Sequence, residues 1–302
     1  MVWAVRRASR ADIPALGDLC RASVGPDDYV TNYLEWVTAN DTVHVALDPR
    51  DRFVGMAVYR TAFDGTGWLG MARTHREYRR QGVNRAIVES FIHLARRRGH
   101  RFLRLWTNAG NSDGVATFGR IGFREVARFT RVQAPPASGA VKSKTVKYDS
   151  QAWRRVQASA LVRAGRGYAH YGWEFIRLNA AILRKCAESG ALRSWRGNLL
   201  AVPDTPRPTA EDAILQLTML AGSTAALLAE GRRIARAEGR PDVGTYVPHT
   251  RSFLDAAKRS GFTVVPWGDE AILCELAVPP RTKGRSTGSA RAGTTRSSGP
   301  CS

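Results

Sequence analysis

A short basic segment with one glycine has the composition of a phosphate-binding turn. It runs from Arg79 to Ala86 and reads Arg-Arg-Gln-Gly-Val-Asn-Arg-Ala. The apolar run 67–72 before it predicts a strand, and apolar residues recur at helical spacing across 87–95 after it. The first amides of a helix lack intrahelical acceptors, and the helix dipole adds positive charge there. We therefore predict an anion site at this turn, where Gly82 lets the backbone approach the ligand.

The turn alone does not define its ligand. It is not a P-loop, because no Gly-Lys-Ser/Thr follows it. It also lacks the Gly-x-Gly-x-x-Gly pattern of dinucleotide-binding proteins. The anion bound at this turn would therefore belong to another kind of phosphate-bearing ligand.

The elements around this turn form a recognisable order in the first half of the chain. The pattern predicts strand, helix, helix, three strands, helix, strand, helix and strand. The predicted strands are 2–7, 42–47, 53–60, 67–72, 102–108 and 126–132, and the predicted helices are 9–22, 27–39, the long helix that ends at Gly99, and 114–120.

The second half repeats this order over a nearly equal span. Both Gly82 to Phe123 and Gly222 to Phe262 contain a glycine, a long helix, a strand, a short helix and Gly-Phe. The predicted segments of this half are two helices within 153–190, strands at 198–203 and 213–220, a helix at 223–237, a strand at 243–247, a helix at 250–259 and a strand at 271–276. We predict a first domain at 1–133, a linker at 134–150, a second domain at 151–277 and a disordered basic tail at 278–302.

Two motifs in register give the first half a resemblance to a known family. Arg79, Gly82 and Asn84 occupy the positions of a Gln/Arg-x-x-Gly-x-Gly/Ala loop, and Asn111 is followed by Phe118 and Gly122-Phe123. With the element order, these residues resemble the GCN5-related N-acetyltransferase (GNAT) superfamily. The resemblance implies an α/β (α+β) fold of tandem GNAT-like domains. Each would have a mixed, mostly antiparallel central sheet flanked by helices, and the C-terminal copy would be degenerate.

The resemblance implies acetyl-coenzyme A as the acyl donor. The backbone at the end of the fourth strand would pair with the pantetheine arm, and the basic turn would bind the pyrophosphate. The cofactor-binding residues implied are Ala72, Arg73, Thr74, Arg79, Arg80, Gln81, Gly82, Val83, Asn84, Arg85, Asn111 and Phe118. Two residues depart from the family pattern. Asn84 replaces the second glycine or alanine, and Phe118 stands where many relatives place a tyrosine that protonates the departing thiolate.

The general base is not defined by any pattern. Acetyl transfer to an amine needs positioning, a neutral amine and donors for the developing oxyanion. Glu35, Asp64, His75 and Glu77 are candidates for deprotonating the amine, but a solvated loop or helix face explains these residues equally well. A water chain would be the alternative route for the proton.

The second copy lacks the basic turn. Its equivalent segment, 216–222, reads Gln-Leu-Thr-Met-Leu-Ala-Gly and holds no arginine. We expect the second copy not to bind coenzyme A and to shape the substrate site or the structure instead.

Composition limits the other function classes. The net charge of +20 favours phosphate-bearing partners, but the basic residues are spread over both halves and the tail, so we rank specific nucleic-acid binding last. The four cysteines are scattered singly, which predicts reduced thiols and no metal site. With no signal-peptide pattern and no long apolar run, we expect a cytoplasmic protein without a membrane partner.

The main hypothesis is an N-acetyltransferase that transfers an acetyl group from acetyl-coenzyme A to an amine of a small molecule or peptide. Its active site would lie in the N-terminal domain. The alternative is an acyl-coenzyme A binding or sensing module without turnover, and a nonspecific nucleic-acid-binding protein is the third. The acceptor is left open.

Overall fold

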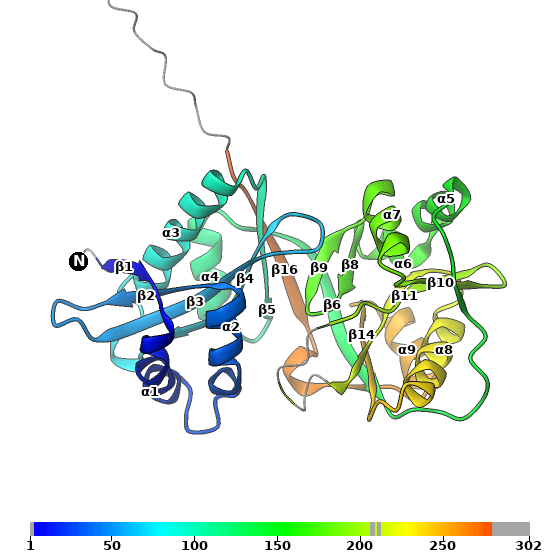
Figure 1. The fold of residues 1–302 in the computed structure, drawn as a ribbon, viewed down its shortest axis with the longest axis horizontal. Coiled ribbons are helices and arrows are strands. Elements are labelled where there is room, and N and C mark those ends of the chain that lie inside the picture. The colour runs from blue at the N-terminus through cyan, green and yellow to red at the C-terminus, as the bar shows by residue number, and fades with distance from the viewer. Residues whose placement is uncertain (1–2, 206–208, 210–212, 280–302) are drawn as a thin grey trace, which may run out of the picture.

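The computed structural model describes residues 3–205, 209 and 213–279, arranged as two halves side by side (Figure 1). The first half contains the predicted order of elements. Its elements are β1 (Ala4–Arg7), η1 (Arg10–Asp12), α1 (Ile13–Ser23), η2 (Tyr29–Tyr33), α2 (Leu34–Asn40), β2 (Thr42–Leu47), β3 (Phe53–Thr61), β4 (Gly67–Thr74), η3 (Arg76–Tyr78), α3 (Val83–Arg98), β5 (Phe102–Asn108), α4 (Ser112–Ile121) and β6 (Arg124–Ala134). The prediction of this order is confirmed.

The long helix α3 shows why the local prediction succeeds. Gly82 and Gly99 flank it, and both adopt the left-handed conformation that favours glycine. Three apolar side chains on one face, Ile87, Phe91 and Ala95, are completely buried in the core of the first half. These signals are local, so the sequence is sufficient to place the helix.

The second half departs from the prediction. Its elements are β7 (Lys144–Thr145), α5 (Ser150–Ala158), α6 (Ala160–Ala164), β8 (Tyr168–Tyr171), β9 (Glu174–Arg177), α7 (Ala180–Glu188), β10 (Leu192–Trp195), β11 (Asn198–Ala201), β12 (Leu215–Gln216), β13 (Thr218–Ala221), α8 (Thr224–Ala237), β14 (Val243–Pro248), α9 (Arg251–Arg259), β15 (Thr263–Val264), η5 (Pro266–Gly268) and β16 (Ala271–Ala277). The prediction of only two helices within 153–190 was wrong, because the hairpin β8–β9 lies between α6 and α7, and β10 was missed.

The hairpin has a physical explanation in its sequence. Residues 168–177 are rich in aromatic side chains, and Gly172 at the turn has a positive φ of 68°. The apolar side chains of Tyr168 and Phe175 pack against the central sheet rather than on a helix face.

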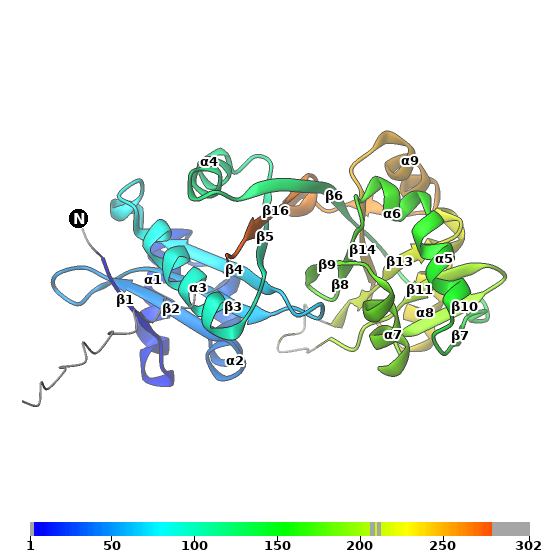
Figure 2. The ribbon, with the colours of Figure 1, turned by 90° about the horizontal axis from the view of Figure 1, so that it is seen from above.

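The main sheet runs through both halves. Its strand order is β1-β2-β3-β4-β5-β16-β6-β14-β12, and β15 also pairs with β6. The last strand of the chain, β16, lies between β5 and β6 and is antiparallel to both. Strand β6 pairs on its other side with β14 of the second half. Each half therefore contributes its last strand to the sheet of the other, as the crossing of β6 and β16 shows (Figures 1 and 2).

A second sheet of four strands, in the order β13-β11-β10-β7, completes the second half. The predicted linker 134–150 contains the short strand β7, and its backbone amides at Lys142 and Ser143 donate to the buried carboxylate of Glu230. Val278, at the start of the predicted tail, is buried, and residues 280–302 lie outside the described part of the chain.

Three further expectations concern cysteines, metals and membranes. Cys20, Cys186 and Cys274 are free and buried, and Cys301 lies outside the described residues. Over residues 3–205, 209 and 213–279, no group of His, Cys, Asp and Glu side chains is arranged to hold a metal ion. Within the same ranges, no helix has both the length and the apolar character that a membrane crossing requires.

Candidate active site at a gap between parallel strands

The parallel strands β4 and β5 pair only at their beginnings. Gly67 pairs with Leu103 and Trp68 with Arg104, and no further pair forms between these strands. β4 continues to Thr74 and β5 to Asn108, so the later residues of both strands present unpaired backbone edges to each other. Such an edge can hydrogen-bond an extended ligand.

A β-bulge lies in β4 just after the strands separate. On β3, Val58 pairs with Gly70 and Met56 with Arg73, so β4 holds one extra residue across this stretch. Met71 in the bulge has a φ of 53°, which is uncommon for a residue with a side chain. The bulge turns backbone groups out of the ladder, so it can present an amide to a reacting carbonyl.

The predicted anion turn lies between β4 and α3. Gly82 is the N-cap of α3 with φ of 84°, and no side chain caps the helix. A Cβ added at Gly82 would meet nothing within 4 Å, so the helix start faces open space. The uncapped amides and the helix dipole make this end of α3 attractive to an anion.

The arginines of the turn are arranged differently from expectation. Arg79 donates from Nη2 to the carbonyl of Ser23 at 2.6 Å, so its guanidinium binds the end of α1 rather than a position beside Gly82. Arg80 pairs with Asp113 at 3.2 Å and Arg85 with Glu89 at 2.8 Å. Both pairs are well exposed and therefore weak, which leaves Arg80 and Arg85 able to exchange partners.

The neighbouring side chains of the turn have structural roles. The backbone carbonyl of Gln81 accepts from Trp3 Nε1 at 2.9 Å, and its side chain donates to the carbonyl of Glu77 at 2.8 Å. Val83 is buried in the core of the first half, and Asn84 is half-buried. Residues 81–84 can therefore contact a ligand mainly through their backbone groups.

The end of β4 is held by a buried ion pair. Arg73 donates from Nε and Nη2 to the two carboxylate oxygens of Asp28, at 2.6 Å each, and its guanidinium lies over the Tyr29 ring. Ala72 is exposed and Thr74 half-buried on either side of it. The Arg73 side chain thus fixes the loop before α2 against β4.

Asn111 and Phe118 belong to α4 and its N-cap, directly after β5. Asn111 caps α4, because its Oδ1 accepts from the amide of Gly114, and its Nδ2 donates to Thr107 Oγ1 at 3.0 Å. Phe118 is buried and packs edge-on against Phe123. No ionisable group therefore occupies the position of the expected acid.

Each of the four candidate bases is either held by a partner or exposed. Asp64 is buried in an ion pair with Arg104, whose guanidinium, together with a hydrogen bond from Thr66, keeps the Asp64 pKa below its usual value despite burial. Glu35 is 68% exposed and lies 3.6 Å from Arg10. His75 accepts from the amide of Glu77, and the Glu77 side chain is exposed.

The structure brings together aromatic residues that the sequence did not single out. Trp106 follows the last paired residue of β5 by two positions, and its ring lies 6.1 Å from Tyr246 on β14 and 6.2 Å from Trp267 on η5. Tyr246 and Trp267 belong to the second half. No local pattern could assign them to this place, because the strand exchange brings them here.

The corresponding helix start in the second half is filled by its own side chains. Gly222 precedes α8 with a φ of 116°, but a Cβ there would lie 2.3 Å from Asn198 Oδ1. That oxygen accepts from the amide of Ser223, and the Ser223 hydroxyl accepts from Ala226. At this helix start the side chains of Asn198 and Ser223 therefore accept the hydrogen bonds of the first amides.

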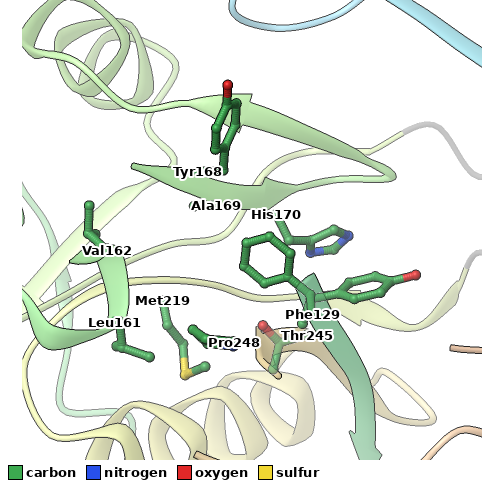
Figure 3. A pocket seen from close by; sticks show the side chains of 10 residues that line it. Phe129, Leu161, Val162, Tyr168, Ala169, His170, Met219, Thr245 and Pro248 are labelled. Atoms are coloured by element: carbon green, nitrogen blue, oxygen red, sulfur yellow. The ribbon is translucent and has the colours of Figure 1, made fainter. Parts of the chain in front are cut away.

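Two cavities lie elsewhere. The smaller, about 10 Å³, lies between β6 and the second half and is lined by residues such as Phe129, His170 and Thr245 (Figure 3). This volume suits a single water molecule. The larger, about 470 Å³, lies at the end of β3 away from the anion turn and is lined by Trp36, Arg60 and Glu174 among others.

Comparison with known proteins agrees with this geometry. A family model described as the acetyltransferase (GNAT) family matches residues 12–123. A protein from Thermoplasma acidophilum assigned to the acetyltransferases shares 17% identity with a TM-score of 0.58, and the match covers 91% of this chain and 99% of that one. A GCN5-related N-acetyltransferase from Sphaerobacter thermophilus shares 13% identity with a TM-score of 0.56, covering 92% and 96%. At these identities, the two similarities show a shared fold and nothing further.

A search of curated proteins gave no match to this sequence. The segment that matches the family model contains the gap between β4 and β5, the bulge and the turn before α3. The segment 12–123, which is less than half of the chain, is thus similar to the acetyltransferase (GNAT) family.

Proposed function

We propose that this protein transfers an acetyl group from acetyl-coenzyme A to an amine, at the gap between β4 and β5 in its first half. The observation that carries the proposal is the end of strand pairing after Trp68 and Arg104, next to an uncapped helix start. An extended thioester arm fits an unpaired strand edge, and a pyrophosphate fits the start of α3.

The residues would divide the binding between them. The backbone of Ala72 to Thr74 would hold the pantetheine arm, and the amides from Gly82 to Arg85 would hold the pyrophosphate with charge from Arg80 and Arg85. The bulge at Met71 would direct a backbone amide toward the thioester oxygen. Asn111 would act through its cap of α4, and Phe118 would support this wall from the core.

Apart from this positioning, acetyl transfer requires little from the protein. The neutral amine attacks the thioester carbonyl, the carbon–nitrogen bond forms, the carbon–sulfur bond breaks, and the sulfur takes up a proton. Holding the two reactants together supplies a large part of the rate. Since Phe118 offers no acid and Asp64 is held by Arg104, we propose that water carries the protons.

A test of the donor site uses two matched glycines. Gly82→Glu places a negative charge at the uncapped start of α3 and should weaken acetyl-coenzyme A binding at least about tenfold, which is about 1.4 kcal/mol. Gly99→Glu introduces the same backbone strain at the other end of the helix, because Gly99 is also left-handed with open space around it. Titration calorimetry on both variants makes the comparison.

The control decides the interpretation. Equal binding by wild type and Gly82→Glu would reject the proposed pyrophosphate site, and no binding by the wild type would reject acetyl-coenzyme A as the donor. Loss of binding in Gly99→Glu as well would assign the effect to damage of α3 rather than to charge.

A second function is favoured by the buried Phe118. With no acid at this position, the protein would bind an acyl-coenzyme A and report its presence without turnover. Release of free thiol across a broad panel of amines separates the two functions. Saturable release with any amine eliminates the sensor, and tight donor binding without release favours it.

A further inference from the structure

The larger of the two cavities, about 470 Å³, lies where the two halves of the chain meet. The first half lines it with residues such as Asp41 and Arg60, and the second half lines it with Glu174 on β9. Arg60 pairs with Trp68 at the start of β4, whereas the anion turn follows the end of that strand. The cavity has the volume of a small-molecule site and shares no lining residue with the proposed donor site.

Two carboxylates at one end of this cavity share a single arginine. Arg60 Nη2 lies 2.8 Å from Asp41 Oδ2, and Arg60 Nε lies 3.9 Å from Glu174 Oε1. The side chains of Asp41 and Glu174 are only 8% and 12% exposed. Across residues 3–205, 209 and 213–279, neither carboxylate forms an ion pair with a second cation. This end of the cavity therefore holds more negative than positive charge when both carboxylates are ionised.

The two carboxylates also lack hydrogen-bond donors. Asp41 Oδ2 is buried, and no group in the described part of the chain gives it a hydrogen bond of regular geometry, although Arg60 is close. Burial raises the pKa of Asp41 even with Arg60 beside it. Burial is likewise the main reason that the pKa of Glu174 rises to about 7, and the Asp41 carboxylate adds to this rise. A ligand that brings N–H donors and a positive charge would stabilise both ionised carboxylates.

An indole ring adds a third feature at the same end. Trp36 on α2 lines the cavity, and its ring centroid lies 5.3 Å from Arg60 Cζ. Aromatic faces attract organic cations, so the ring and the two carboxylates favour the same kind of ligand group. Among the residues that the structure describes, no side chains are grouped to hold a metal ion. An organic ammonium is therefore the cation that this end of the cavity suits.

The other end of the cavity is basic. Neighbouring residues of a strand point to opposite faces of a sheet, so Tyr59 lies on the α3 side and Arg60 on the α2 side. Arg98 at the end of α3 lies 5.2 Å from the Tyr59 ring centroid and donates to Thr42 Oγ1 at 3.1 Å. Arg98 and Arg7 both line the cavity and are exposed. The cavity therefore extends around the end of β3, from the shared carboxylates on one side to two arginines on the other.

We propose that this cavity binds a small zwitterion, with its ammonium at Asp41 and Glu174 and its carboxylate at Arg98 and Arg7. An ammonium has three N–H donors, so it can contact both acidic side chains while Arg60 keeps its place. Carboxylates match the planar donor geometry of arginine. The ligand class is an amino acid whose two charges are separated by a flexible chain. The inference is independent of the proposed acetyl transfer, because the cavity and the donor site are formed by different residues.

The test uses ligands that differ in their charged groups. The central set is 5-aminopentanoate, pentylamine and pentanoate, and 3-aminopropanoate and 7-aminoheptanoate vary the separation of the two charges. Titration calorimetry uses the full chain at pH 8, where the Glu174 carboxylate is mostly ionised. We expect at least one ω-amino acid to bind at least about tenfold more tightly than both pentylamine and pentanoate. It should also raise the melting temperature, whereas sodium chloride at equal ionic strength should not.

Variants test each end of the cavity separately. Asp41→Asn combined with Glu174→Gln should weaken binding of the ω-amino acid at least about tenfold, whereas Asp18→Asn on the exposed face of α1 should not. Arg98→Met should lower the affinity for the ω-amino acid to that for pentylamine. Arg97→Met is the matched control and should leave both affinities unchanged, because Arg97 is exposed next to Arg98 and does not line the cavity.

Several results would overturn the proposal. Equal affinity for pentylamine and for every ω-amino acid would show that the arginines bind no carboxylate, and equal affinity for pentanoate would show that no ammonium is bound. Absence of binding by all five compounds would reject the site. If the double variant does not fold, Glu174→Gln is used alone, and an unchanged affinity for the ω-amino acid overturns the proposal as well. Failure of acetyl-coenzyme A to bind would reject the proposed function and not this inference.

Discussion

At the scale of single residues, two buried arginines, Arg104 and Arg131, differ in the partners that surround them. Arg104 is 1% exposed and lies between the carboxylates of Asp64 and Glu275, which come from the two halves of the chain. Arg131 is equally buried, and no carboxylate among the described residues pairs with it. The charge of Arg104 is neutralised by the two carboxylates, whereas Arg131 is held by a hydrogen bond to Gln216 and by aromatic rings.

Glu174 allows a prediction about pH. Burial is the main reason that the pKa of Glu174 rises to about 7, although Arg60 lies nearby. An unfolded glutamate titrates near pH 4.3. Between these pH values, folding is accompanied by uptake of a proton at Glu174. The free energy of unfolding therefore decreases as the pH rises from about 4 to about 7.

Glu174→Gln should remove this dependence. The variant should be more stable than wild type at pH 8, by at most about 4 kcal/mol, with little difference at pH 4. Urea unfolding at several pH values measures it, and Glu77→Gln on the exposed turn is the control. A constant difference between variant and wild type across the range would contradict the raised pKa.

At the scale of elements, the exchanged strand β16 is central to the first half. It pairs along the full length of β5 and brings Glu275 to Arg104. Without it, β5 would be an uncovered edge and Arg104 would lose one of its two carboxylates. The element order of the first half is predictable from sequence, but the strand that completes its sheet comes from the end of the chain.

Truncation tests this dependence. A chain of residues 1–149 contains every element of the first half but lacks β16. We expect it to aggregate or to remain partly unfolded as a monomer, and a peptide of residues 269–279 added in trans should recover folded protein. Circular dichroism and gel filtration make the measurement. A monomeric fragment that unfolds cooperatively without the peptide would show that β16 is dispensable.

At the scale of the whole molecule, the exchange joins two halves into one continuous sheet. Strands β5, β16, β6 and β14 alternate between first and second half across the centre of the molecule (Figure 1). Such a junction should make unfolding a single transition, in contrast to two domains joined only by a linker.

A core substitution far from the junction examines the coupling. Leu183 on α7 is completely buried in the second half, and Leu183→Ala should cost about 2–5 kcal/mol. We expect hydrogen exchange protection to fall by the same factor in β5 as in α7. Protection that falls in α7 alone would show that the halves unfold separately.

The sequence by itself determined the features that local windows encode. The period of apolar residues and the two flanking glycines placed α3, and the motif around Gly82 with Asn111 and Gly122 led to the family. The hairpin at 168–177 was misassigned, because an aromatic-rich run can form either a helix or a strand until its packing partner is known. The tail beyond residue 279 lies outside the described chain.

Only the tertiary structure decided which distant residues meet. Trp106 pairs across the sheet with Leu273, and Arg131 pairs with Tyr246, over separations that no local pattern spans. A strand has the same composition whether it completes its own half or the other, so the exchange has no signal in sequence. The donor turn was therefore predictable, because its chemistry lies in one contiguous segment. The cavity at Asp41 and Glu174 was not, because residues from several segments of both halves line it.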